Sequence, residues 1–599
     1  MGFFFIKNRW IQDQITHLLK LLSNLILFIS ILDLILMVIW FGYEVNDLYR
    51  TCVKLVFDCS LFIFFIHLLT QIYNNFKISH IRRNLFYLFL TIPYILFFVT
   101  LFLPETLSAN TYRSIMYSNT YVALLTGISA VVFLSKSLIE SMIKRINPFL
   151  LMSFSFFFVI VAGTILLSLP KSVYVPVSFI DTLFIVTSGV CVTGLSPLTI
   201  SEVFTLEGQT ILMLLIQIGG LGVMTITSFF GVFFIGSISL SNQFALNNIL
   251  STESIGSLLK MLLYVFGFTI VFELTGATLM WLSVHGTLDM HFTDEVFFCL
   301  FHSVSAFCNA GFSTLPEGLT SPLLTGNNLF YWIVSSLIIC GGIGFPILAN
   351  LIHTLYIYAF KMRFNRQNLK MHKQYHILSL NSKIVLTFTA FLLTGGAVLF
   401  ALVEWTNGAM HFSAFGKISH SFFLSASART AGFNSFDLTM LSLPSILLLL
   451  FLMWIGGGAQ STAGGIKVNV FAVAFYTIVS VMKGKTRVEI GHREISNDSI
   501  LRVLTTISLS LLLLGTSTFI ILLIEKDKDF ISILFECMSA MTTTGLSLNL
   551  TGYLENESKV ILILLMFIGR VGFLTFFMGF SRQVKSDKYR YPIDNIIIN

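Results

Sequence analysis

A short apolar segment that stops at a glycine occurs four times in this chain, each time between two longer apolar segments. The copies read FIDTLFIVTSGVCVTGLSPL, VFFCLFHSVSAFCNAGFSTL, ISHSFFLSASARTAGFNSF and ILFECMSAMTTTGLSLNL, with Gly194, Gly311, Gly432 and Gly545. Each copy has a serine about six residues before the glycine and Leu or Phe directly after it. Repeats within one chain can be compared without any other sequence. The recurrence therefore predicts four copies of one structural unit.

The composition places these copies in a membrane. Of 599 residues, 55% are hydrophobic and only 11% are charged, too few to cover the surface of a soluble domain of this length. Apolar runs of about 20 residues, each long enough to cross a bilayer core as a helix, recur along the chain. We expect an all-α polytopic membrane protein with twelve spans and four half-spans that enter from outside.

The charge of the connecting loops predicts the orientation. Since basic loops stay in the cytoplasm, we expect both termini inside and a location in the cell (inner or plasma) membrane. The same rule accounts for the net charge of +7 without a nucleic-acid partner. No small-residue cleavage site follows the first apolar run, so the first span is expected to remain in place. The loops predicted to be cytoplasmic are 74–84, 140–147, 236–257, 359–383, 480–500 and 581–599.

Four apolar segments precede the first copy, at roughly 17–42, 53–73, 84–103 and 119–139. None carries Arg or Lys at every third position, as a voltage sensor would need. We interpret them as an accessory bundle without an assigned role, in which Asp33, Asp58 and His67 form polar contacts. The predicted division is an N-terminal bundle at 1–145, repeats at 146–250, 251–375, 376–495 and 496–580, and a cytoplasmic tail at 581–599.

A half-span that stops at a glycine has a physical consequence in lipid. Its unpaired backbone groups must line water or be buried in protein, and glycine tolerates the backbone angles of such a turn. Four turns around one axis would give a ring of carbonyl oxygens, as in potassium channels. The C-terminal ends of the preceding helices, which carry partial negative charge, would favour a cation there. One such segment alone is more simply a buried helix with a glycine cap, but four in register favour a pore.

At these residues the sequence resembles the Trk/Ktr/HKT superfamily of potassium transporters, and most of all the KtrB-type membrane subunits of bacterial Ktr systems. The resemblance covers about 146–599. It departs at Phe573, where the family usually has proline, and residues 1–145 have no counterpart in ordinary members. The matching motifs are TSGVCVTGL, IQIGGLGVMT, SAFCNAGF, GGIGFPIL, SARTAGF, GGGAQSTAGGIKVN, SAMTTTGL and IGRVGFLT.

The resemblance implies a selectivity filter. Family members with serine at the first-repeat glycine tend to favour sodium, so Gly194 implies potassium selectivity and leaves sodium dependence open. Transported K⁺ is expected at the backbone carbonyls of Thr193, Asn309, Thr430 and Thr544. The filter residues implied are Val192, Thr193, Gly194, Leu195, Asn309, Ala310, Gly311, Phe312, Thr430, Ala431, Gly432, Phe433, Thr543, Thr544, Gly545 and Leu546.

A gate is implied by the glycine-rich run within the apolar stretch 443–478. Glycine costs about 1 kcal/mol per helical residue against alanine, so an irregular loop is expected. In the family this is the intramembrane gating loop, which Arg570 would contact. The alternatives are a flexible kink, and for Arg570 a structural partner of carbonyls. The gate residues are Gly456, Gly457, Gly458, Ala459, Gln460, Ser461, Thr462, Ala463, Gly464, Gly465, Lys467 and Arg570.

Other polar residues at membrane depth are expected to be structural. We interpret Asp181, Glu273 and Glu536 as hydrogen-bonding groups, and His302 and Arg429 as scaffold of the short helices.

The resemblance also implies partners. The tail YPIDNIIIN resembles the end of KtrB-type subunits, which packs at a homodimer interface. Family members sit on a cytosolic ring of nucleotide-binding regulatory subunits. No Rossmann fingerprint occurs in this chain, so nucleotide control would come from that separate KtrA-like RCK-type ring.

Three classes of function compete. A channel-like potassium transporter could use the membrane potential, because one charge gains about 2.3 kcal/mol per 100 mV. An alternating-access carrier predicts two inverted halves, whereas the four copies here share one orientation. A membrane enzyme is not indicated, since the sequence shows no HExxH, paired-carboxylate or nucleophile signature. The first class is favoured.

Overall fold

The computed structural model describes residues 25–44, 46–77, 91–99, 118–142, 148–222, 255–288, 290–363, 379–405, 412–491, 493–580 and 592. Predictions for 1–24, for most of the predicted cytoplasmic loops and for nearly all of the tail lie outside these residues. The described chain is helical apart from one antiparallel hairpin, β1 (Glu489–Ile490) with β2 (Arg493–Glu494).

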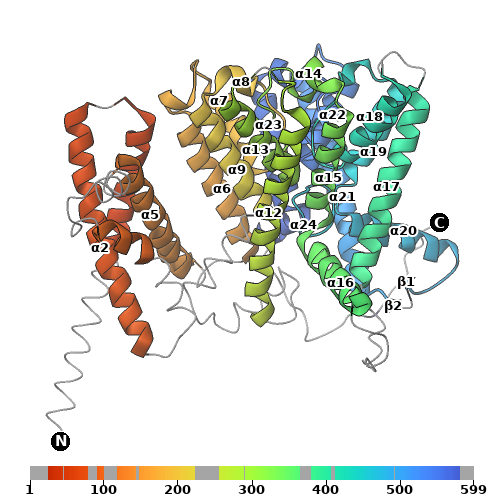
Figure 1. The fold of residues 1–599 in the computed structure, drawn as a ribbon. Helices are drawn as coiled ribbons and strands as arrows, with labels where there is room; N and C mark the ends of the chain where they lie inside the picture. The colour runs from red at the N-terminus through yellow and green to blue at the C-terminus, as the bar shows by residue number, and fades with distance from the viewer. Residues whose placement is uncertain are drawn as a thin grey trace, which may run out of the picture.

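The N-terminal helices form a bundle with its own core (Figure 1). Phe57 and Phe64 are fully buried there and pack with Phe133. The first two helices are each long and apolar enough to cross a membrane. The helices are Leu25–Gly42, α2 (Asp47–Lys77), 91–99 and α5 (Asn119–Met142).

From residue 148 onwards one order of elements recurs: a long helix, a short helix, an extended stretch and a second helix. The long helices are α6 (Pro148–Leu167), α12 (Ile255–Val284), α17 (Leu380–Glu404) and α21 (Asn497–Ile524). The short helices are α7 (Phe179–Val190), α13 (Phe292–Cys308), α18 (Ala414–Ser427) and α22 (Phe530–Thr542). The second helices are α9 (Leu206–Leu221), α15 (Asn328–Ile343), α19 (Leu443–Trp454) and α23 (Asn556–Val571). The connections contain α8 (Ile200–Val203), α14 (Pro322–Thr325), η1 (Pro170–Ser172), η2 (Gly318–Thr320), η3 (Leu438–Met440) and η4 (Thr551–Tyr553).

The short helices begin at residues that satisfy their free backbone N–H groups. Ser178 accepts from the N–H of Asp181 before α7, Ser413 caps α18 in the same way, and the Asp529 carboxylate accepts from two N–H groups of α22. α13 instead has two acidic residues in its first turn, which favour the positive end of the helix dipole.

Three of the four second helices stop at a glycine inside the apolar region, a break that was not predicted from the sequence. α9, α15 and α23 each stop before a glycine with positive φ: Gly222 (80°), Gly344 (106°) and Gly572 (94°). After two of these breaks the chain bends sharply, by 101° into α16 (Phe345–Arg363) and by 95° into α24 (Phe573–Phe580). A residue with positive φ cannot continue a right-handed helix, so each of these helices ends before its glycine.

The outer faces of the long helices are apolar. Leu282 of α12, Phe391 of α17 and Phe519 of α21 are all more than 60% exposed, as expected for side chains that face lipid. Among the described residues five helices could cross a membrane, or seven if each bent pair is one span. The predicted all-helical, multi-pass membrane architecture is confirmed at this level.

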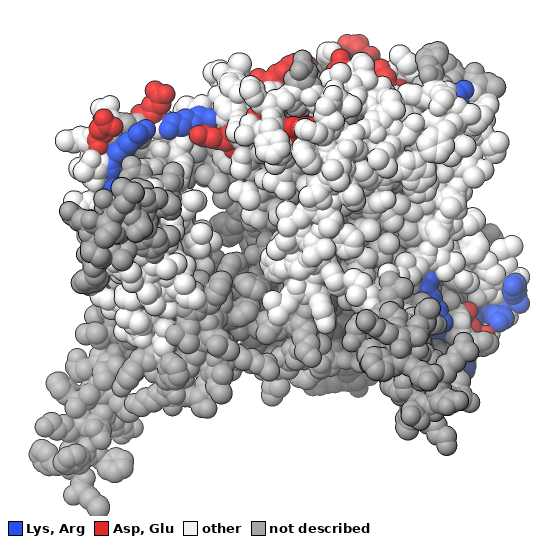
Figure 2. Space-filling model, in the orientation of Figure 1, with Lys and Arg blue, Asp and Glu red and all other residues white. Residues whose placement is uncertain are grey.

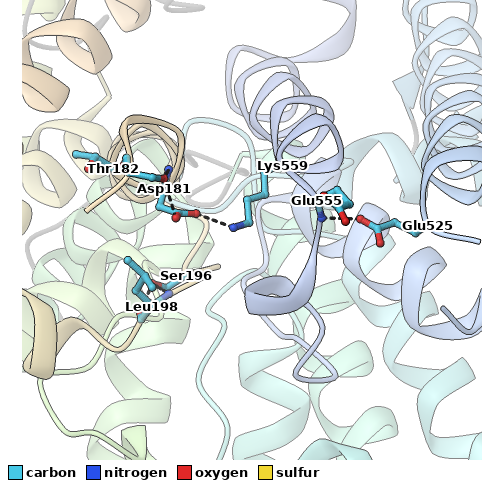
Figure 3. A network of polar contacts seen from close by, with 8 residues as sticks. Asp181, Thr182, Ser196, Leu198, Glu525, Glu555 and Lys559 are labelled. Carbon is cyan, nitrogen blue, oxygen red and sulfur yellow. Dashed lines mark hydrogen bonds and ion pairs between the residues drawn. The ribbon is translucent and has the colours of Figure 1, made fainter. Parts of the chain in front are cut away.

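An ion pair ties the first of these units to the last. Lys559 Nζ of α23 donates to Asp181 Oδ1 of α7 at 2.7 Å, and Ser178 Oγ donates to Asp181 Oδ2 at 2.8 Å (Figure 3). Both charged side chains are largely buried, at 9% and 16% exposure. Nearby, the backbone N–H of Glu555 donates to Glu525 at the end of α21. Asp181 was predicted to be structural, and it lies in a structural contact.

We predict that Lys559→Met alone destabilises the protein, because it leaves the Asp181 carboxylate buried without its partner. The expected cost is about 3–5 kcal/mol, and the double variant with Asp181→Asn should recover most of it. Thermal unfolding in detergent measures both. Equal stability of the single and double variants would contradict a coupled pair.

Candidate functional site

The four glycines of the repeated segments meet in a ring. A Cβ atom placed on any of them would lie 2.1–2.7 Å from a carbonyl oxygen of the next copy and about 3.0–3.1 Å from the Cα of its glycine. The contacts run in cyclic order and close on themselves. The carbonyls are those of Ala310 for Gly194, Ala431 for Gly311, Thr544 for Gly432 and Thr193 for Gly545.

Each turn has the same backbone pattern. The glycines have positive φ, and so do the residues two positions earlier, none of which is glycine: Val192 (56°), Asn309 (61°), Thr430 (71°) and Thr543 (50°). Non-glycine residues seldom adopt these angles, and holding them there costs about 1–3 kcal/mol each. Four such strained pairs at matching positions indicate that the surrounding structure imposes this conformation.

The serine found before each glycine braces the turn. Ser188 and Ser539 accept a hydrogen bond from the N–H of Gly194 and of Gly545, both at 3.0 Å. In the other two copies the serine hydroxyl donates instead to the carbonyl after the glycine, Ser305 to Phe312 and Ser427 to Phe433. The carbonyl of each serine also accepts from the residue that precedes the glycine. The brace therefore differs between copies followed by Leu and copies followed by Phe.

The carbonyls predicted to hold the cation are not at equivalent positions of the four turns. Thr193 and Thr544 directly precede their glycines, whereas Asn309 and Thr430 lie two positions before theirs. The prediction therefore mixed two levels. In the structure the equivalent carbonyls are Thr193, Ala310, Ala431 and Thr544 at one level and Val192, Asn309, Thr430 and Thr543 at the next.

Buried polar side chains support the turns from behind. His302 Nε2 lies 2.9 Å from Ser313 Oγ, and the Glu536 carboxylate accepts from the hydroxyls of Ser547 and Thr551. Glu273 of α12 accepts from Gln217 of α9 at 3.1 Å. These contacts agree with the structural roles predicted for His302, Glu273 and Glu536.

Three threonine hydroxyls at the ring are buried without a hydrogen-bond partner among the described residues: Thr193, Thr430 and Thr543. Within the same described part of the chain, no cluster of three His, Cys, Asp or Glu side chains could hold a metal ion. What the ring offers to a ligand is thus neutral oxygen, from carbonyls and hydroxyls.

The glycine-rich run forms an irregular loop between α19 and α20 (Val468–Met482). Its backbone bonds to the end of α15 in another unit: the N–H of Gly458 donates to Gly342, that of Thr462 to Gly341, and Gln460 accepts from Phe345. A Cβ on Gly464 would lie 1.9 Å from Thr543 Oγ1. The loop therefore passes directly against the ring.

Three basic side chains hold this loop. Arg570 of α23 donates to the carbonyls of Thr462 and Gly219, and Lys467 donates to the carbonyl of Ala463 at 2.6 Å. Arg429, next to the ring residue Thr430, donates to the carbonyl of Gly456 at 3.1 Å. Its contact with the loop was missed, although it is the only Arg or Lys in the four repeated segments.

A second set of glycines was also missed. A Cβ on Gly219, Gly341 or Gly569 would lie 1.9–2.1 Å from a carbonyl at the end of the neighbouring short helix, those of Val190, Phe307 and Met541. Only glycine permits this approach. The signal was present in the sequence, because a GxxG motif follows three of the four ring glycines: Gly219–Gly222, Gly341–Gly344 and Gly569–Gly572.

Taken together, the fold and the ring define a multi-pass membrane protein with a buried, uncharged oxygen site at one point of its helical body.

Comparison with known proteins identifies its relatives. Residues 168–591 match the TrkH family, described as cation transport protein. The chain is 35% identical over 469 residues to the potassium/sodium uptake protein NtpJ of Enterococcus hirae, covering 76% of this chain and 98% of that protein. It is 34% identical over 450 residues to the Ktr system potassium uptake protein B of Bacillus subtilis, covering 75% and 96%.

The fold is similar to the crystal structure of the potassium transporter TrkH from Vibrio parahaemolyticus, with a TM-score of 0.58 at 15% identity, over 82% of this chain and 97% of that one. The chain belongs to the TrkH family of cation transport proteins. The resemblance inferred from its motifs is confirmed, and the family is one of transport proteins rather than enzymes.

We predict that Gly432→Ala destabilises the protein by at least the 1–3 kcal/mol typical of a strained backbone, because its Cβ would meet the Thr544 carbonyl at 2.5 Å. Gly395→Ala in α17 is the matched control, since nothing lies within 4 Å of its Cβ. The control should change stability by no more than about 1 kcal/mol. Thermal unfolding in detergent compares the two, and equal effects would contradict the packing of the ring.

Proposed function

We propose that the protein is a potassium-selective uptake channel or channel-like transporter that moves K⁺ down its electrochemical gradient. The observation that carries this proposal is the closed ring of Gly194, Gly311, Gly432 and Gly545. In this proposal the repeats 146–250, 251–375, 376–495 and 496–580 surround one central pore. Residues 1–145 form an accessory bundle beside it.

The ion chemistry follows from the ligands. A dehydrated monovalent cation needs oxygen atoms in place of its water, and backbone carbonyls at two successive levels supply them without negative charge. The hydroxyls of Thr430 and Thr543, which have no hydrogen-bond partner among the described residues, are further neutral oxygen atoms at the ring. The C-terminal ends of α7, α13, α18 and α22 point their partial negative charge toward the same place. The names of two relatives, potassium/sodium uptake protein and potassium uptake protein, favour K⁺ and keep Na⁺ coupling open.

The loop 455–467 is proposed as the gate. It contacts the ring at Thr543 and is held by backbone bonds to α15 and by Arg429 and Arg570. A loop tied by a few hydrogen bonds can move when these bonds are exchanged. Arg570 adds a positive charge beside the proposed path, which opposes cation passage while the loop is in place.

The charge distribution supports an orientation with the hairpin side in the cytoplasm. Acidic side chains lie along much of the upper edge of the molecule, together with some basic ones, and basic side chains, with a few acidic ones, lie near β1 and β2 at the lower right (Figure 2). Since basic segments favour the cytoplasmic side, both termini are proposed to be cytoplasmic. K⁺ would then enter from the acidic side, driven by about 2.3 kcal/mol per 100 mV.

The proposed partners are a second copy of this chain and a cytosolic ring of KtrA-like nucleotide-binding subunits. The support is the name of one relative, Ktr system potassium uptake protein B, which assigns that protein to a Ktr system. Any nucleotide would act through that ring.

We predict that Gly194→Ser lowers the selectivity for K⁺ over Na⁺ by at least tenfold, about 1.4 kcal/mol. The added atoms would displace the Ala310 carbonyl, which lies 2.5 Å from the position of a Cβ. Flux of K⁺, Rb⁺ and Na⁺ into proteoliposomes measures this. Gly326→Ser is the control, because nothing lies within 4 Å of its Cβ. Unchanged selectivity in Gly194→Ser would show that the ring is not the filter.

We predict that Arg570→Gln increases K⁺ flux several-fold. The substitution removes two charge-assisted bonds to carbonyls, each worth about 1.5–3 kcal/mol, and with them the anchor of the loop. Arg502→Gln on the exposed face of α21 controls for the loss of charge. A folded Arg570→Gln protein with unchanged flux would argue that the loop is only structural.

A further inference from the structure

The N-terminal bundle contains a carboxylic acid at the middle of a membrane span. Asp33 is near the centre of the helix Leu25–Gly42 and is completely buried, at 0% exposure. Ser60, which is also near the middle of its span in α2, donates to Asp33 Oδ1 at 2.9 Å. A charged group at this depth is costly and marks a functional site unless it is well compensated.

Among the described residues, Asp33 has too few hydrogen-bond donors and no positive charge to offset the cost of burying its carboxylate. Its Oδ2 has no hydrogen-bond partner among the described residues, and no ion pair to Asp33 occurs there. The hydroxyl of Ser30, fully buried on the same face of the helix, also lacks a partner in the described part of the chain. Among the described residues, one oxygen of the Asp33 carboxylate and the hydroxyl of Ser30 are therefore unpaired, and the carboxylate receives one neutral hydrogen bond.

Two other buried carboxylates of this protein, those of Glu404 and Glu536, have more hydrogen-bond donors than Asp33. Glu404 Oε1 accepts from the backbone and side chain of Ser442 and from Ser445. Glu536 accepts from two hydroxyls. Among the described residues, the Asp33 carboxylate is therefore less well satisfied than the carboxylates of Glu404 and Glu536.

The other two helices of the bundle bring further hydroxyl groups. Tyr94, in the helix 91–99, lies close enough to Asp33 for the two groups to interact electrostatically, and its hydroxyl donates to Ser129 of α5. Both residues are buried. All four helices thus place oxygen-bearing side chains in one apolar core.

We propose that the N-terminal bundle binds a monovalent alkali cation at Asp33, with Ser30 and Ser60 as further ligands. Carboxylate and hydroxyl oxygens are hard ligands, typical of sites for alkali and alkaline-earth ions. One carboxylate balances one positive charge, whereas a divalent ion would leave a net charge inside an apolar bundle. In the same bundle, Asp58 interacts electrostatically with Lys54, one turn before it on α2. This site is separate from the ring of glycines and does not depend on its proposed function.

The test is hydrogen exchange of the full-length protein in lipid nanodiscs at fixed pH and ionic strength. Peptides from 25–42 and 47–77 are compared in choline, Li⁺, Na⁺ and K⁺. At a cation concentration of about ten times its dissociation constant, exchange through opening of the bundle should slow by about tenfold. Asp33→Asn should abolish this protection, because the amide can keep the bond from Ser60 but cannot balance a cation.

Asp58→Asn is the matched control and should retain the protection. Ser30→Ala, which keeps the carboxylate, should shift the response to higher cation concentration and provides the test if Asp33→Asn does not fold. The proposal is overturned if none of the three cations slows exchange, if Asp33→Asn and Ser30→Ala both respond like the natural chain, or if only acidification, and no alkali cation, protects the bundle.

Discussion

The hydrogen-bonding demand of the peptide backbone in a medium without water governs this structure. At each of four places the chain leaves its helix in the apolar region, and every N–H and C=O group released there needs a partner or a ligand. The serine one and a half turns earlier supplies part of that need through both its hydroxyl and its carbonyl. The carbonyls on the opposite side of each turn face the neighbouring copy, and the ring of glycines is what brings them together.

The same demand explains the loop between α19 and α20. Its glycines approach the carbonyls of α15 within distances that no side chain permits, and its own carbonyls accept from Arg429, Lys467 and Arg570. The loop is therefore stabilised by groups from three different units. A movement of any of these units would therefore change the contacts of the loop. This gives a physical basis for coupling between the loop beside the ring and the helices around it.

Much of this arrangement could be predicted from the sequence because the four copies of the repeated segment can be compared with one another within a single chain. The four turns, their glycines, the bracing serines and the irregular loop all followed from recurrence and from the behaviour of glycine in lipid. The breaks at Gly222, Gly344 and Gly572 were not predicted, since apolar residues continue on both sides of them. The pairing of Lys559 with Asp181 depends on how the first and last units meet, which no local pattern records. The N-terminal bundle precedes the residues that match the family, so only its own contacts bear on its role.

The most direct measurement of the central claim is anomalous X-ray scattering from crystals of this protein soaked in Tl⁺ or Rb⁺. The account predicts a peak on the axis of the ring, in contact with the carbonyl oxygens of Thr193, Ala310, Ala431 and Thr544. A map with clear density for all four turns and bound ions elsewhere, but none on that axis, would contradict it.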